Sequence, residues 1–194
     1  KKEEVNKVIN KMPSNPIPNK AFKNLKNLHF SDVGKEWGLA TPSFSNGAAY
    51  ADLDNDGDLD LIVNNVNQKA FVYRNNSREY NKNNYIAISL KYKSPNSFAI
   101  GSIIKVYQGD QIISREIMPS RGFQSCVDYK QTIGLGKLGA DSITITWPDR
   151  SITSIVKPVI NKLYNIEYSS ASVKQISKPV IAEPVLFEKV KSNF

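Results

Sequence analysis

Alternation of apolar and polar residues dominates the second half of the chain. From residue 85 onward, apolar side chains fall on every second position, which is the period of a strand with one buried face. Such runs occupy residues 85–92, 103–107, 112–118, 142–147, 152–156 and 163–168. Turn sequences at residues 108–111 and 148–151 separate two pairs of runs, as hairpin connections do. The pattern predicts an all-β, mainly antiparallel β-sandwich or barrel over residues 84–169.

The first half of the chain has shorter elements. Apolar residues at helical spacing over residues 2–12 predict a short amphipathic helix that ends before Pro13. A proline-rich connector follows, residues 35–39 suit one helical turn around Trp37, and residues 47–53 and 59–63 suit two strands around an acidic turn. The last 25 residues are typical of a linker. We therefore divide the chain into residues 1–19, 20–83, 84–169 and 170–194.

Composition and charge narrow the classes of function. The chain has 194 residues, 40% hydrophobic and 23% charged, which is typical of a folded soluble domain. It contains no apolar run long enough to span a membrane. The net charge is +8, but the excess lysines lie in residues 1–26 and 151–194 rather than on one basic face, so we expect no nucleic-acid partner. Single residues of cysteine and histidine exclude an internal disulfide and a Cys/His zinc cluster.

The strongest chemical signal is the acidic segment DLDNDGDLD at residues 52–60. Ca²⁺ prefers six to eight oxygen ligands, and carboxylates at alternate positions of a tight loop can converge on one ion. The pattern predicts side-chain ligands from Asp52, Asp54, Asp56 and Asp60, a backbone carbonyl from Asp58 and a sharp turn at Gly57. The segment is not an EF-hand, because residue 63 is Val and the flanking residues suit strands. The alternative is a solvated acidic turn without a metal.

A second motif, GLGKLG at residues 134–139, matches the dinucleotide-binding fingerprint. That fingerprint requires a helix whose N-terminus holds the pyrophosphate. The residues that follow, 142–148, alternate and are β-branched, so we expect no helix and no nucleotide. We interpret the glycines as a loop between strands.

Taken together, these motifs resemble two known families. Residues 44–65, around the acidic loop, resemble the calcium-binding loop of FG-GAP/VCBS repeats, the integrin-like blades of β-propellers. The second half resembles the ASPIC/UnbV domain in four segments. These are AIGSIIKVY at 99–107, RGFQS at 121–125, GLG at 134–136 and ITWPD at 145–149. Similar architecture occurs in large secreted or surface-attached bacterial proteins.

The resemblance implies calcium at Asp52, Asp54, Asp56, Asp58 and Asp60, a propeller blade over residues 20–83 and a β-rich C-terminal module. It implies no catalytic residue. A single complete acidic loop cannot form a closed propeller, and residues 22–24 weakly echo residues 73–75. We therefore expect the chain to be part of a longer repeat protein, whose remaining blades are its partners. The alternative is that the echo is a coincidence.

Four residues of the second half are distinctive: Arg121, Phe123, Gln124 and Asp128. They are candidates for contact with a ligand. The interpretation that we favour is structural, with Phe123 packed in the core and Arg121 paired with Asp128 beside a turn.

These observations predict a non-enzymatic, calcium-stabilised binding or adhesion module of a secreted or cell-surface protein. We expect an extracellular, periplasmic or outer-membrane location, with any signal upstream of this sequence, and a protein or glycan partner. The alternative is a carbohydrate-binding module in which Trp37, Trp147 or tyrosines stack on sugar rings. A hydrolase is the third class, and it would require a pocket of perturbed polar groups outside the acidic loop.

Overall fold

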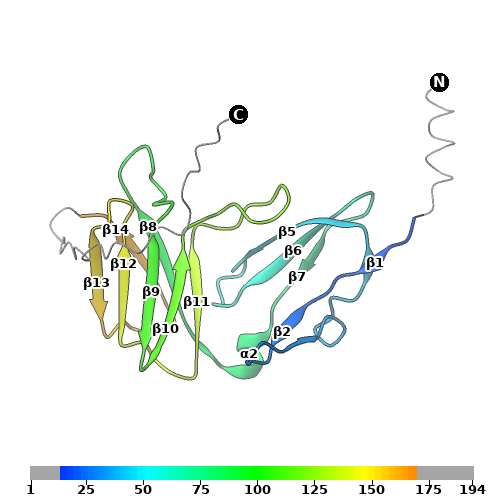
Figure 1. Ribbon diagram of the computed structural model, residues 1–194, viewed down its shortest axis with the longest axis horizontal. Coiled ribbons are helices and arrows are strands. Elements are labelled where there is room, and N and C mark those ends of the chain that lie inside the picture. The colour runs from blue at the N-terminus through cyan, green and yellow to red at the C-terminus, as the bar shows by residue number, and fades with distance from the viewer. Residues whose placement is uncertain (1–13, 170–194) are drawn as a thin grey trace, which may run out of the picture.

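The computed structural model describes residues 14–169, in which two β-rich parts follow one another (Figure 1). The predicted helix over residues 2–12 and the predicted linker over residues 170–194 lie outside the described residues. Within the described chain the structure is mostly β with one short helix, and no helix there is long and apolar enough to cross a membrane. The predicted all-β, mainly antiparallel fold is confirmed for these residues.

The second part, which we call the β-module, consists of two sheets. One has the strand order β10-β9-β12-β13 and the other has the order β11-β8-β14. The strands are β8 (Asn84–Lys91), β9 (Ile103–Gln108), β10 (Gln111–Glu116), β11 (Gln131–Gly136), β12 (Ser142–Thr146), β13 (Ile152–Val156) and β14 (Lys162–Glu167). β14 runs parallel to β8, and the other strand pairs of the module are antiparallel. The sheets stay separate, so the module is a sandwich and not a closed barrel.

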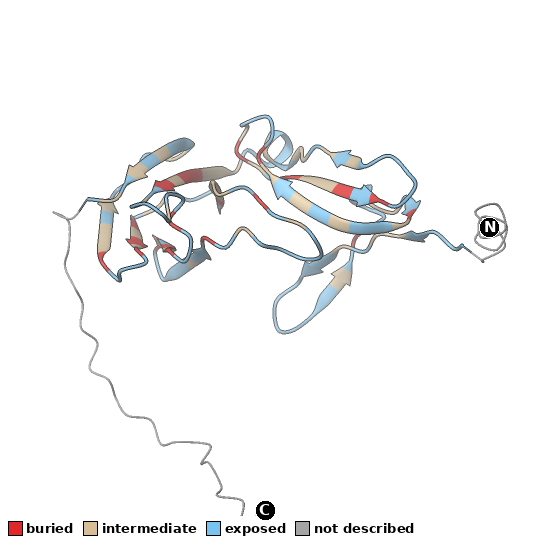
Figure 2. Ribbon diagram, turned by 90° about the horizontal axis from the view of Figure 1, so that it is seen from above, coloured by how far each residue is buried: buried red, intermediate tan, exposed pale blue. Residues whose placement is uncertain are grey.

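The core of the protein lies between these two sheets. Alternate residues of β8, β9, β11 and β12 form one buried apolar cluster, and Figure 2 shows buried positions along the strands of this half of the molecule. The cluster includes Ile86, Ile88, Leu90, Ile104, Val106, Ile133, Leu135, Ile143, Ile145 and Trp147. Alternation in the sequence therefore identifies the inner faces correctly.

The prediction of a loop at Gly134 and Gly136 is wrong. Both glycines belong to strand β11, which pairs with β8 through an irregularity between these two residues. Ile133 and Leu135 point into the core, whereas the glycines occupy the exposed positions. Because glycine has no side chain, the outward positions of β11 carry no polar residues, and the alternation that identifies a strand is absent from the sequence here. Strand β12 follows the motif, and no helix stands between them.

The first part contains short strands and little core. Its strands are β1 (Ile17–Pro18), β2 (Phe22–Asn24), β3 (Phe30–Asp32), β4 (Pro42–Ser43), β5 (Ser45–Ala51), β6 (Asp60–Asn65) and β7 (Phe71–Tyr73). β5, β6 and β7 form an antiparallel sheet, β1 pairs with β4, and β2 pairs with β3. Among its described apolar residues only Val33 and Val63 are buried. This part, which we call the loop unit, therefore obtains little stability from apolar burial.

Two helical features accompany the loop unit. The predicted turn at residues 35–39 is present, because the Trp37 amide donates to the Val33 carbonyl at 2.9 Å. The five-residue helix α2 (Ser77–Asn81), which connects the loop unit to the β-module, was not predicted. It is too short to show a helical period in the sequence.

We predict that Ile145→Ala lowers the free energy of unfolding by about 2–5 kcal/mol, because it opens a cavity in the sandwich core. Ile112→Ala is the matched control, since Ile112 lies exposed on β10 of the same sheet. We expect the control to change stability by less than about 1 kcal/mol. Urea unfolding followed by circular dichroism checks both values, and equal losses would contradict the assignment of the core.

A polar network closes one end of the sandwich. Asp149, in the turn between β12 and β13, accepts hydrogen bonds from the Ser151 amide (3.0 Å), the Ser151 hydroxyl (2.6 Å) and the Tyr168 hydroxyl (2.8 Å). The hydrogen bond from the Ser151 hydroxyl is the main reason that the pKa of Asp149 lies well below its usual range. Asp149 thus joins the end of β14 to the turn after β12.

This lowered pKa gives a pH-dependent prediction. The ionised Asp149 stabilises the fold fully above about pH 4, the pKa of an unfolded aspartate, and the contribution is lost as the pH falls further. Asp149→Asn should therefore destabilise the protein at pH 7, and the difference from the wild type should shrink between pH 4 and pH 2. Denaturant unfolding across this range measures it. Asp110→Asn, on an exposed turn, serves as the control, and a difference independent of pH would refute the role of the charge.

Candidate functional site

The acidic segment forms the connection of the β5–β6 hairpin. Ala51 pairs with Asp60 at the last register position, and residues 52–59 form the loop between them. Asn55 and Gly57 adopt positive φ angles of 59° and 96°, which turn the chain sharply. Successive carboxylates are thereby brought to one side of the turn.

Three of the five predicted ligands come together. Asp52, Asp54 and Asp56 each place a carboxylate oxygen within 4.8 Å of the others. The side chain of Asp52 is only 3% exposed. One of its oxygens, Oδ1, is buried and has no hydrogen-bond partner in the described chain. A buried carboxylate oxygen without a donor is costly, so this site is well suited to a cation.

The other two predicted ligands, Asp58 and Asp60, hold the backbone. Asp60 accepts from the amide of Leu53 (2.9 Å) and from the amide of Asn75 (2.8 Å), which closes the loop and fastens the segment after β7. Asp58 accepts from the Ser77 hydroxyl (3.2 Å) and the Arg78 amide (3.0 Å) at the start of α2. Burial raises the pKa of the Asp58 carboxyl. The structure therefore separates the five aspartates into a converging group of three and a bracing pair.

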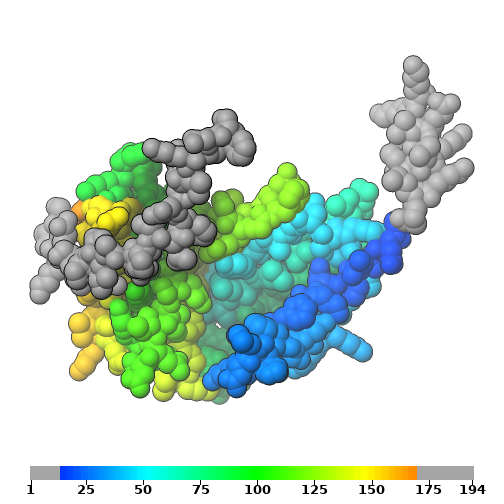
Figure 3. Space-filling model, viewed as in Figure 1, coloured from blue at the N-terminus to red at the C-terminus, as the bar shows by residue number. Residues whose placement is uncertain are grey.

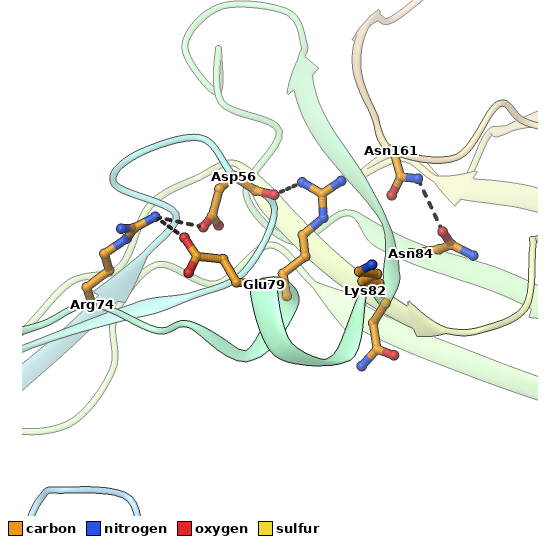
Figure 4. Close-up of a pocket in the computed structure, with 8 residues that line it drawn as sticks. Asp56, Arg74, Glu79, Lys82, Asn84 and Asn161 are labelled. Atoms are coloured by element: carbon orange, nitrogen blue, oxygen red, sulfur yellow. Dashed lines mark hydrogen bonds and ion pairs between the residues drawn. The ribbon is translucent and has the colours of Figure 1, made fainter.

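Two arginines compensate the loop from the side of α2, and Figure 4 shows one of them, Arg74, beside Asp56 and Glu79. Arg74 forms ion pairs with Asp54 (2.8 Å), Asp56 (3.7 Å) and Glu79 (3.0 Å), and the charge of Asp54 is the main reason that its pKa is raised. Arg78 donates to the backbone carbonyl of Asp56. Both arginines, Asp56 and Glu79 line a cleft of about 430 Å³, in which Arg74 is already paired with the two acidic residues.

Lys130 approaches the loop from the β-module. Its ammonium lies 2.9 Å from Oδ1 of Asn55, 3.4 Å from the carbonyl of Asp52 and 3.6 Å from Oδ2 of Asp52. The Lys130 side chain is only 16% exposed. Neither Arg74 nor Lys130 was predicted, because 20 residues separate Arg74 from Asp54 and 78 separate Lys130 from Asp52, and no local pattern connects either pair.

The structural interpretation of the second residue group is wrong. Phe123 is 64% exposed and does not pack in the core, and Arg121 forms no ion pair with Asp128 within the described chain. Arg121 and Asp128 instead line a cleft of about 450 Å³ between the β-module and the loop unit. Figure 3 shows the two parts meeting along this seam. Phe123 and Gln124 lie outside the cleft lining, on an exposed loop.

That exposed loop rests on the loop unit at one glycine. A Cβ at Gly47 of β5 would lie 3.1 Å from the carbonyl oxygen of Phe123 and 3.0 Å from the Ser125 hydroxyl. Ser125 donates to that same carbonyl at 2.8 Å, which shapes the loop. Gly47 therefore allows the two parts to approach closely.

The sugar-stacking alternative loses one of its candidate residues. Trp147 is 2% exposed and packs against Tyr92 and Tyr168 with ring centroids 5.8 and 5.3 Å apart. It serves the core and has no free face for a ligand. Trp37 is about half exposed.

Comparison with known proteins supports one half of the predicted architecture. A family model described as ASPIC and UnbV matches residues 92–173. Cartilage acidic protein 1 of Xenopus tropicalis is 30% identical over 128 residues, which are 63% of this chain and 19% of that protein. The chain thus spans about a fifth of the length of this curated relative. The β-module is therefore similar to the ASPIC/UnbV family over the matched residues, and the likeness of the loop unit to FG-GAP/VCBS repeats stays a prediction.

We predict that Gly57→Ala destabilises the protein more than Gly101→Ala does. Both glycines have positive φ (96° and 85°), so each substitution costs about 1–2 kcal/mol of backbone strain. A Cβ at Gly57 would in addition overlap the ring of Tyr85, whereas the space around Gly101 is open among the described residues. Thermal unfolding in EDTA compares the variants. Equal losses would contradict the packing of Tyr85 on the loop.

Proposed function

We propose that the chain is a non-enzymatic, calcium-stabilised binding module of a secreted or cell-surface protein. The observation that carries the proposal is the buried Oδ1 of Asp52, which has no donor within residues 14–169 and belongs to a side chain that converges with Asp54 and Asp56. An all-oxygen ligand set of carboxylates favours a hard cation such as Ca²⁺ over zinc or copper.

The residues present fit this ion. Asp52, Asp54 and Asp56 would hold it with side-chain oxygens, while Asp58 and Asp60 keep the loop closed by their hydrogen bonds to backbone amides. The loop has five carboxylates in nine residues, so a divalent cation relieves strong repulsion. Modules that work in millimolar extracellular calcium need dissociation constants of only about 10⁻⁴–10⁻³ M, which suits the partly exposed Asp54 and Asp56.

Exposed apolar side chains of the loop unit support its place in a larger repeat array. Phe22 and Phe30 lie on one face of the β2–β3 pair and are exposed, as are Leu25 and Leu28 in its turn. A unit that cannot bury its apolar surface alone gains stability from stacked neighbours. We propose further β-blades of the parent protein as the partners of this face.

A second candidate function is the binding of an acidic sugar or another carboxylated ligand in the cleft between the parts. Neither Arg115 nor Arg121, which both line it, forms an ion pair within residues 14–169. Guanidinium groups bind carboxylates in a planar, bidentate manner, and the neighbouring Tyr50 offers a partly exposed ring. Glu116 and Asp128 on the same wall would oppose a ligand of high negative charge.

We predict that calcium stabilises the wild-type protein and fails to stabilise Asp52→Asn. With a dissociation constant of about 10⁻⁴ M, about 5 mM CaCl₂ contributes about 2.3 kcal/mol, which raises the melting temperature by roughly 5–9 °C. Differential scanning calorimetry in EDTA and in CaCl₂ measures the shift.

Asp110→Asn is the control for this experiment, because Asp110 is an exposed aspartate outside the acidic loop. It should retain the full calcium shift. An unchanged melting temperature in the wild type, or an equal shift in Asp52→Asn, would refute calcium binding at this loop.

A further inference from the structure

We propose that the acidic loop is a calcium-dependent joint, through which metal binding in the loop unit stabilises the β-module and fixes its orientation. The inference rests on the calcium site proposed above and adds a second role to it. Three separate contacts between the loop and the β-module carry it.

The first contact is the packing of Tyr85 on Gly57. Tyr85 belongs to β8, the central strand of its sheet, and its ring lies so close to Gly57 that no side chain fits there. The guanidinium of Arg78 lies over the same ring, 4.6 Å from its centroid, and donates to the Asp56 carbonyl. The turn of the loop is therefore held against the module by an aromatic ring and the cation stacked on it.

The second contact is Lys130, which lies directly before β11. Its three oxygen partners belong to Asp52 and Asn55, so they occupy the acidic loop itself. Asp52 supplies a carboxylate to the converging group and a backbone carbonyl to Lys130. The oxygens of Asp52 and Asn55 that accept from Lys130 therefore move with the loop, and their position depends on the loop conformation that the metal favours.

The third contact is α2, which is clamped at both ends. Asp58 of the loop accepts from the amide of Arg78 in its first turn, and Lys137 donates to the carbonyls of Asn81 and Lys82 at its C-terminal end. Lys137 lies between β11 and β12 of the β-module. The helix therefore connects the acidic loop to the module as a short strut.

These contacts make binding and docking thermodynamically coupled. Calcium favours the loop conformation in which Gly57, Asn55 and Asp52 face the β-module, so it also favours the docked arrangement. By linkage, a docked β-module must raise the affinity of the loop for calcium by the same factor. Removing Lys130 should weaken the coupling and leave the carboxylates in place.

The two tryptophans allow this coupling to be measured. Trp37 lies in the loop unit and Trp147 lies in the core of the β-module, so Trp37→Phe leaves a fluorophore that reports the β-module alone. Urea unfolding of this variant is followed by fluorescence in EDTA and in about 5 mM CaCl₂, with calorimetric titration of CaCl₂ alongside. We expect calcium to raise the Trp147 midpoint by roughly 0.5–1 M urea.

Adding Lys130→Met should reduce this shift to less than half while calcium binding remains detectable by calorimetry. Asn55→Gly removes the other side of the contact, keeps a residue suited to positive φ, and should act in the same direction. Lys105→Met, an exposed lysine on β9 away from the loop, should retain the full shift.

The outcomes separate the two proposals. Calcium binding without movement of the Trp147 midpoint would overturn the joint and leave the metal site intact. A full shift in both Lys130→Met and Asn55→Gly would likewise overturn it. Absence of any calcium heat in the parent variant would overturn the metal site, and the joint with it.

Discussion

Repulsion among five carboxylates within nine residues is the constraint around which the first half of the structure is arranged. Backbone amides of Leu53 and Asn75 bond both carboxylate oxygens of Asp60, and the start of α2 bonds Oδ2 of Asp58, whose Oδ1 is buried without a hydrogen-bond partner among the described residues. Arg74 compensates the exposed side of the loop and Lys130 compensates its buried side. Apart from Leu53, these groups come from three segments: the residues after β7, the start of α2 and the β-module. The charge of the loop is therefore compensated by contacts that hold these three segments together.

The two parts of the chain are stabilised by different kinds of interaction. The β-module buries a continuous apolar cluster between two sheets, and the free energy of this burial offsets the loss of conformational entropy on folding. In the loop unit, Val33 and Val63 are the buried apolar residues among those described, while Asp52, Asp60 and Asn65 are buried polar residues. Polar contacts, which contribute less net free energy per group, must hold this unit. A bound cation and a stacked neighbour would therefore raise the stability of the loop unit by a larger fraction than that of the sandwich.

The sequence could predict the features that depend on residues close together in the chain, and it could not predict contacts between distant segments. Alternation revealed the strands of the β-module wherever side chains marked both faces, and failed at β11, where Gly134 and Gly136 occupy the outer positions. The converging aspartates were predictable because the turn that gathers them is local. The contact of Lys130 with the loop was not predictable, since it depends on how two distant segments meet. The exposure of Phe123 was not predictable either, because an aromatic residue outside any alternating run has no pattern that assigns it to a face. The short α2 left no period to detect.

Lys130 and a calcium ion can coexist at this loop, and charge balance explains why. The five aspartates contribute a charge of minus five, which Arg74, Arg78 and Lys130 reduce to minus two. A divalent ion brings the total to zero, so the lysine need not be expelled when the metal binds. Its two closest partners are neutral oxygens, the Asn55 amide and the Asp52 carbonyl, and the only converging carboxylate that it pairs with in the described chain is that of Asp52, through Oδ2 at 3.6 Å. Lys130 thus faces Oδ2 of Asp52, whereas Oδ1 of the same carboxylate has no hydrogen-bond partner among the described residues and is left for a metal. A joint between the two parts is therefore compatible with a metal site.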